Sequence, residues 1–147
     1  MTTAGYTLEN AQQALASQPF SRLIGARLTA YTESDVEITI DVTERLHQQH
    51  GSVHGGVIAY AADNALAFAA TTKLGKGMVT AGLNINFLRP ARGSLLIARA
   101  TVLHTTGRQA VCRCEIYTMN PGRDRDHVAT VTGTIVRSSH STTSAQV

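Results

Sequence analysis

The amino-acid sequence predicts an α+β domain with one antiparallel sheet and one long, buried helix. Two observations carry this prediction. The run from Gly55 to Lys73 is rich in alanine and contains no proline, and before its last residue it has a single charged side chain. Six shorter runs alternate between apolar and polar residues, and Gly, Pro or Asp separates most of them. Because helices and strands differ in hydrophobic period, these patterns predict one central helix and six strands.

The size of the chain predicts a single domain. The sequence has 147 residues, of which 43% are hydrophobic and 16% are charged, which is enough for one core and too few for two ordinary domains. We expect the domain to cover residues 1–137 and a disordered tail to cover 138–147, where serine and threonine dominate. The sequence shows no secretory signal and no apolar run of roughly 20 residues. We therefore expect a cytoplasmic protein without a membrane partner.

A short helix and a hairpin are predicted before the long helix. Residues 8–17 should be helical because Thr7 can cap them and Ala and Gln favour the interior, and Pro19 should stop this helix. Strands are predicted over residues 22–31 and over VEITIDV, residues 36–42, with TESD as the turn between them. Every second residue of VEITIDV is apolar, which is typical of a strand with one buried face.

The long helix and four more strands make up the rest of the domain. The run from Gly55 to Lys73 should end at Gly75 and Gly77. Because it is apolar on nearly all sides, it should be wrapped by a sheet or pressed against a partner. The strands after it should form an antiparallel sheet in which sequence-adjacent strands are joined by short turns. Their predicted ranges are 78–88, 94–104, 108–117 and 127–137.

Cysteines, histidines and overall charge exclude several classes of site. Cys112 and Cys114 are two apart on a strand-like run, so we expect reduced thiols packed on one face. Neither this pair nor the group His47, His50 and His54 has the spacing of a known metal motif, so no metal is expected. The net charge is +3 and the arginines are scattered, which favours a small anionic ligand over a nucleic-acid partner.

Asp63 stands out because it is the only charged residue between Gly51 and Thr72, and a carboxylate in apolar surroundings needs a specific reason. The motif HGGVIAYAADN, the string LNINFLRPA and the element order resemble the hotdog-fold acyl-CoA thioesterases, in particular the PaaI-like and hydroxybenzoyl-CoA thioesterase branches. The resemblance covers roughly residues 20–137. It implies a curved antiparallel sheet wrapped around a long central helix, and subunits whose two sheets join into one.

The resemblance also implies the catalytic residues. Gly55 would direct its backbone N–H at the thioester carbonyl, at the positive end of the helix dipole. Asp63 matches the catalytic carboxylate, either as nucleophile or as the base that activates water. Gln48 would bond the thioester oxygen or orient a water, with Gln49 as the neighbouring alternative. Thr80 matches a Ser or Thr near the reacting water.

Further residues are expected to hold the substrate. His54 resembles a positioning residue that hydrogen-bonds the backbone at the turn into the helix. Two other positioning residues and three arginines for coenzyme A phosphates complete the set that the resemblance implies: Gly56, Asn64, Arg89, Arg92 and Arg108.

The predicted function is hydrolysis of an acyl- or aryl-acyl-CoA to the free acid and CoA, with no metal and no cofactor apart from the CoA of the substrate. Gly55 and Asp63 are eight residues apart, roughly 12 Å along one helix, which is too far to serve one carbonyl. We therefore expect a homodimer with shared active sites, assembled as a dimer of dimers into a homotetramer. Two alternatives remain open: a non-catalytic acyl-CoA-binding module and a hotdog acyl-CoA hydratase.

Overall fold

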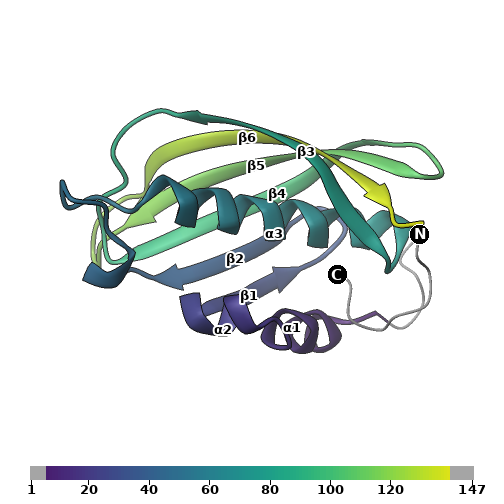
Figure 1. Ribbon diagram of the computed structural model, residues 1–147, viewed down its shortest axis with the longest axis horizontal. Coiled ribbons are helices and arrows are strands. Elements are labelled where there is room, and N and C mark those ends of the chain that lie inside the picture. The colour runs from purple at the N-terminus through teal and green to yellow at the C-terminus, as the bar shows by residue number, and fades with distance from the viewer. Residues whose placement is uncertain (1–5, 140–147) are drawn as a thin grey trace.

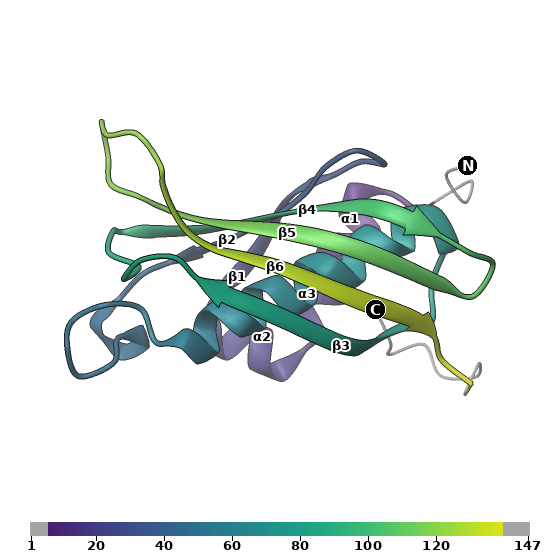
Figure 2. The same ribbon diagram turned by 90° about the horizontal axis from the view of Figure 1, so that it is seen from above.

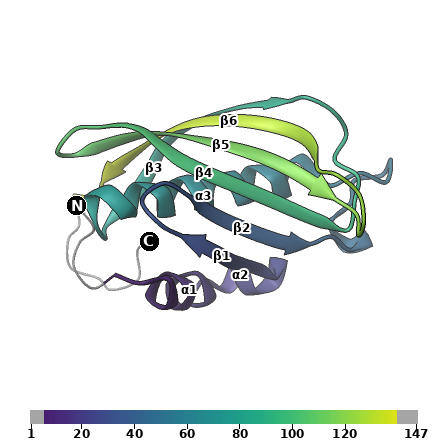
Figure 3. The same cartoon turned by 180° about the vertical axis from the view of Figure 1, so that it is seen from behind.

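The computed structural model describes residues 6–139, which form a curved antiparallel sheet around one long helix (Figure 1). The sheet has six strands in the order β1-β2-β4-β5-β6-β3. Helices α1 and α2 lie beneath β1 and the long helix α3 (Figure 3). This is the hotdog arrangement expected from the sequence. The elements are α1 Leu8–Ala16, α2 Pro19–Ile24, β1 Ala26–Tyr31, β2 Val36–Asp41, α3 Gly55–Leu74, β3 Met78–Phe87, β4 Leu95–Thr105, β5 Gln109–Met119 and β6 Asp126–Arg137.

Helix α3 forms the centre of the core, as predicted. It extends one residue beyond the predicted end, and Gly75, with φ of 79°, caps it. Most of its side chains are buried, including Leu66 and Phe68 at 0% exposure. Alanine has the highest helix propensity and lets the strands approach closely. The sequence therefore favours both the helix and its enclosure.

The strands turn one face toward α3 and the other outward. On β5, Cys112 and Cys114 are both fully buried on the inner face and are free thiols, which confirms the prediction of packed cysteines. Burial raises the pKa of the Cys112 thiol to about 11 and raises the pKa of Cys114 as well. Because the thiolate is costly in such surroundings, both groups remain protonated at neutral pH.

The segment between α1 and β1 differs from the prediction. Pro19 does end the first helix, but it also begins a second one, α2, at a position where the missing proline N–H costs no hydrogen bond. Residues 22–24 are therefore helical, and the strand predicted over 22–31 starts only at Ala26. Gly25 ends α2 with φ of 80°, a conformation that glycine adopts without strain.

The position of β3 corrects the expected strand order. The pairs β1–β2, β4–β5 and β5–β6 are antiparallel neighbours, as predicted. Strand β3 does not pair with β4, because α3 carries the chain across the sheet and β3 joins β6 at the far edge (Figure 2). Strand β2 takes the place beside β4. Within residues 6–139, the outer edge of β3 has no partner strand.

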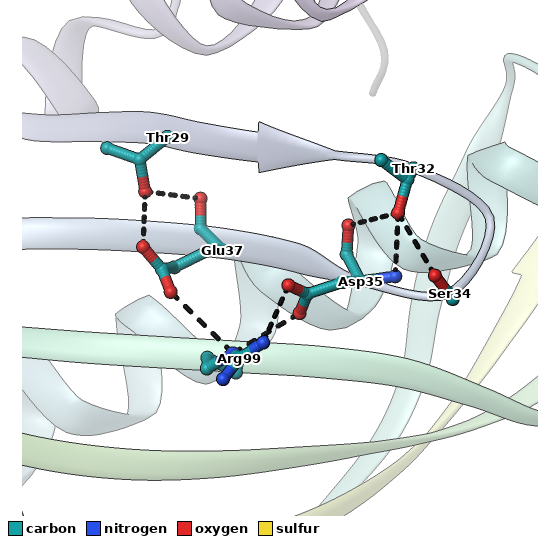
Figure 4. A network of polar contacts seen from close by, with 6 residues as sticks. All are labelled: Thr29, Thr32, Ser34, Asp35, Glu37 and Arg99. Atoms are coloured by element: carbon teal, nitrogen blue, oxygen red, sulfur yellow. Dashed lines mark hydrogen bonds and ion pairs between the residues drawn. The ribbon is translucent and has the colours of Figure 1, made fainter.

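A polar network on the outer face ties the β1–β2 hairpin to β4 (Figure 4). Arg99 donates to the two carboxylate oxygens of Asp35 at 3.3 and 2.7 Å, and its Nε lies 3.6 Å from a carboxylate oxygen of Glu37. The hydroxyl of Thr29 donates to Glu37 at 2.8 Å. Because these groups are partly exposed, the network mainly sets the register of the hairpin and adds little stability.

The ends of the domain are only partly described. The Ser138 amide donates to the Gly77 carbonyl at 2.7 Å, so the chain is still packed at the first residue of the predicted tail. Residues 1–5 and 140–147 lie outside the described residues, and so does the disorder predicted for 140–147. None of the helices in residues 6–139 is long and apolar enough to cross a membrane.

We predict that Gly133→Ala destabilises the domain, because β6 touches α3 at this residue. A Cβ there would lie 2.9 Å from Cδ1 of Leu66 and 3.2 Å from the Gly82 carbonyl oxygen. Overpacking of this kind costs about 1–3 kcal/mol, which should lower the urea midpoint. The control is Gly107→Ala, where nothing lies within 4 Å of the added carbon. Equal midpoints for the two variants would contradict the close contact.

Candidate active site

The cap formed by His54 determines which amide is available at the start of α3. Its imidazole Nδ1 accepts a hydrogen bond from the Gly56 N–H at 2.8 Å, and its carbonyl accepts from the Val57 N–H at 2.9 Å. The Gly55 N–H has no acceptor among residues 6–139. Because this N–H lies at the positive end of the helix dipole, it is a ready donor to a polarised or anionic oxygen.

A cleft of about 390 Å³ opens beside Gly55. Gln48 lines it, and the side-chain oxygen of Gln48 accepts a hydrogen bond from the His50 N–H. The amide N–H₂ of Gln48 is therefore the group that remains free to donate. Gln49 is exposed and is not part of the cleft wall. The geometry thus favours Gln48 over its neighbour.

The loop that carries Gln48 is held by its own backbone. The Gln48 N–H donates to the Ser52 carbonyl at 2.9 Å, and the Gly51 N–H donates to the Gln48 carbonyl at 3.2 Å. Gly51 has φ of 82°, which a residue with a side chain adopts only under strain. This tight turn holds Gln48 in position in the absence of a ligand.

A second hollow, of about 340 Å³, lies farther along α3, between the helix and the start of β3. Asp63 lines it from the helix and Thr80 lines it from the strand. Asp63 is partly exposed, and within residues 6–139 its carboxylate makes no hydrogen bond or ion pair. A carboxylate that holds no structural contact is available to a substrate or a water.

Two amide side chains share this hollow with Asp63. Asn64 is 8% exposed, yet its side chain has no hydrogen-bond partner within residues 6–139. Gln18 reaches the hollow from the residue that precedes α2. Gln18 was not predicted as a site residue, because it stands far from the motif and no local sequence pattern connects it with Asp63.

The predicted catalytic residues of one chain fall into two groups. Gln48 and Gly55 share the first cleft, whereas Asp63 and Thr80 share the second hollow. Both groups lie along α3, where the eight-residue interval corresponds to about 12 Å. Both hollows also border β3. The first cleft includes Phe87, the last residue of the strand, and the second hollow includes the first residues of the strand. Within one chain the predicted residues therefore lie in two separate hollows, both along the edge strand β3.

Two of the three arginines proposed for phosphate binding lie near the first cleft. Arg89 lines it and forms an exposed ion pair with Asp126 at 3.9 Å. Arg92 is exposed, and its Nη1 lies 3.7 Å from the position that a Cβ would occupy at Gly51. Arg89 thus lies in the cleft wall, and the Arg92 guanidinium lies beside the turn that carries Gln48.

Arg108 lies elsewhere in the chain. Its carbonyl accepts from the Arg137 N–H, and the Arg137 guanidinium donates to the Leu74 carbonyl at the far end of α3. A helix of 20 residues separates that end from Gly55, about 30 Å at the usual rise. The structure does not bring Arg108 together with the other two arginines in one chain.

Within residues 6–139, no group of three or more His, Cys, Asp or Glu side chains is arranged to hold a metal ion. Of the three histidines considered from the sequence, His54 already uses Nδ1 to cap α3. The candidate groups at both hollows are therefore amides, a carboxylate, a hydroxyl and a backbone N–H.

Known proteins share this sequence and this arrangement. The model of the thioesterase superfamily matches residues 50–124, which include Gly55, Asp63 and Thr80. A putative esterase from Haemophilus influenzae is 34% identical over 115 residues, covering 77% of this chain and 83% of that protein. Acyl-coenzyme A thioesterase PaaI from Escherichia coli is 30% identical over 109 residues, covering 74% of this chain and 77% of that protein.

A solved structure agrees with the sequence matches. The crystal structure of a thioesterase family protein from Silicibacter pomeroyi superposes with a TM-score of 0.81 at 28% identity, covering 86% of this chain and 93% of that one. These findings confirm the family and the fold expected from the HGG motif and the order of helices and strands along the chain. The chain belongs to the thioesterase superfamily.

Proposed function

We propose that the protein is an acyl-CoA thioesterase that hydrolyses an acyl- or aryl-acyl-CoA to the free acid and CoA. One observation carries the proposal: on the same buried helix, the carboxylate of Asp63 and the N–H of Gly55 both lack hydrogen-bond partners among residues 6–139. Thioester hydrolysis requires a donor for the carbonyl oxygen and a nucleophile or base for the carbon. The E. coli relative, an acyl-coenzyme A thioesterase, supports the substrate class.

In the proposed reaction, the Gly55 N–H and the Gln48 amide bind the thioester oxygen and stabilise its negative charge as the carbon becomes tetrahedral. Asp63 either attacks the carbon and forms an anhydride that water cleaves, or takes a proton from the attacking water. On both routes the C–S bond breaks, CoA leaves as a thiolate that is then protonated, and Asp63 returns to its ionised form. Thr80 orients the water. No step uses a metal or a cofactor.

We further propose that each site is completed by a second copy of the chain. Two copies can pair their β3 edges in antiparallel fashion about the midpoint of the strand. Phe87, at the end of one β3, then lies opposite Met78, at the start of the other. The first cleft borders Phe87 and the second hollow borders Met78. This pairing brings Gly55 of one copy to Asp63 of the other, in two equivalent sites related by a two-fold axis.

Exposed apolar side chains on and beside β3 support a contact there. Leu83, Phe87 and Leu88 are 38%, 57% and 51% exposed, and grouped apolar surface beside an unpaired edge is typical of an interface. A homodimer is therefore the proposed active unit. A dimer of dimers and a cytoplasmic location stay predictions from the sequence.

We predict that Asp63→Asn lowers kcat about a hundredfold or more and changes KM far less. The variant keeps the side-chain shape and removes the charge needed in the transition state, and each tenfold is about 1.4 kcal/mol. Release of free thiol from benzoyl-CoA and from a medium-chain acyl-CoA is the measurement. Turnover near that of the wild type would refute the assignment of Asp63.

We predict that Ala at both Arg89 and Arg92 raises KM for CoA esters and leaves short pantetheine thioesters little affected, because exposed Arg–phosphate contacts contribute mainly to binding. The difference should shrink as salt is added. Arg27→Ala, at the opposite edge of the sheet, is the matched control. Equal effects on the two substrate classes would argue against phosphate contact.

We predict that Asp63→Asn protein, unfolded and refolded together with Gln48→Ala protein, regains activity. Mixed dimers carry one site in which both residues are intact, so random pairing of equal amounts restores up to about a quarter of the wild-type sites. Each variant refolded alone is the control. If verified mixed dimers remain as inactive as their parents, the shared-site model fails.

A further inference from the structure

The hollow around Asp63 contains polar groups that the proposed reaction does not use. Ala67, Met78 and Val79 form its apolar wall, and Gln18 and Asn64 add two amides. When Asp63 or its water attacks the thioester carbon, the acyl side of that carbon must lie within a few bond lengths of the carboxylate. The acyl group therefore meets the walls of this hollow, amides included.

A chain of hydrogen bonds fixes the amide of Gln18. The hydroxyl of Tyr60, on α3, donates to the Ser21 hydroxyl, which in turn donates to the side-chain oxygen of Gln18 at 2.6 Å. Ser21, at the centre of this chain, is 1% exposed, whereas Gln18 and Tyr60 are partly exposed. Because the Gln18 oxygen is engaged, the N–H₂ of the amide is the group left free, and within residues 6–139 it has no acceptor.

The contact between α2 and α3 does not depend on the Gln18 side chain. Gln18 occupies the N-cap of α2, yet its side chain makes no capping hydrogen bond. The contact between α2 and α3 is already made by the Ser21–Tyr60 bond and by the edge-on packing of Phe20 on Tyr60, at 5.3 Å between ring centres. Extension of the hydrogen-bond chain to Gln18 holds the oxygen of its side chain at the edge of the hollow.

Asn64 adds a second amide that a ligand in the hollow would meet. The residue is 8% exposed and its amide makes no hydrogen bond among the described residues, but its polar atoms still reach solvent through the hollow. A ligand that fills the hollow displaces this solvent and must replace its hydrogen bonds. A purely hydrocarbon acyl group would leave both amides unpaired.

We infer that Gln18 is a specificity-determining residue whose N–H₂ donates to an oxygen carried by the acyl group. The enzyme then favours CoA esters whose acyl part bears a hydroxyl or carbonyl oxygen over the same esters without it. Ser21 and Tyr60 act as positioning residues that orient the Gln18 amide. This inference rests on the proposed function, because it places an acyl group beside Asp63.

The test uses matched pairs of esters that differ by one oxygen: hexanoyl-CoA against 3-hydroxyhexanoyl-CoA, and benzoyl-CoA against 4-hydroxybenzoyl-CoA. The measurement is the ratio of kcat/KM within each pair. Wild-type protein should prefer the oxygenated member of at least one pair by about fivefold, the size of one net hydrogen bond. Because each ratio compares two esters on one protein, a general loss of activity cancels.

Gln18→Glu is the sharpest variant, since it keeps the size of the side chain and an acceptor for Ser21 but replaces the N–H₂ with an oxygen. The preference should fall to one or below, and in Gln18→Leu it should fall to about one. Ser21→Ala should weaken the preference and Ser21→Thr, which keeps a hydroxyl, should restore it. Gln13→Leu, at an exposed position on α1, should keep the wild-type ratio. Thermal unfolding checks that each variant is folded.

Two results distinguish failure of the inference about Gln18 from failure of the proposed thioesterase function. If wild-type protein hydrolyses the esters but shows no preference in either pair, or if Gln18→Glu keeps the wild-type ratio in both, the role of Gln18 is overturned while the thioesterase activity stands. If wild-type protein releases no thiol from any of the four esters, the proposed function itself fails, and the inference fails with it.

Discussion

The enclosure of α3 is the constraint on which the rest of the structure depends. The helix is apolar on nearly every side and cannot face water alone. The sheet curves around it, and α1 and α2 lie beside it on the β1 side (Figure 1). The enclosure leaves an open strip between α3 and the start of β3. Asp63 occupies that strip, where a carboxylate keeps contact with solvent and needs no buried countercharge.

The same helix provides the two groups with opposite electrostatic character that an acyl-transfer site needs. Its first turn offers a free N–H because His54 satisfies the next two amides, while the Gly55 N–H has no acceptor in the part of the chain that the structure describes. Two turns later it presents an uncommitted carboxylate. Both groups are attached to a rigid, fully packed element, so little reorganisation is required when substrate binds. The two groups are about 12 Å apart along the helix, and the proposed pairing with a second copy would bring each to the complementary group of the other.

Local sequence patterns predicted most of the individual helices and strands. They did not predict which strands pair or which distant residues come together. The alanine run, the alternation in VEITIDV and the Cys112–Cys114 spacing each report on a few adjacent residues, and each matches the structure. Helix α2 was not predicted, because a helix of six residues that begins at Pro19 is too short to show a hydrophobic period. The place of β3 beside β6 depends on how α3 crosses the sheet, which no single segment encodes. For the same reason Gln18 joins the Asp63 hollow only through tertiary packing, and Arg108 is separated from Arg89 by the length of α3.

The eight-residue interval between Gly55 and Asp63 limits how this fold can change in evolution. Surface loops such as 120–125 can gain or lose residues, because their backbones face solvent and position nothing at either hollow. One residue inserted into the first two turns of α3 would rotate everything after it by about 100°. Asp63 would then turn away from the open strip, and a neighbour that now packs under the sheet would take its place. Length changes in this stretch should therefore be removed by selection even when every catalytic side chain is kept, while substitutions that preserve the count remain open.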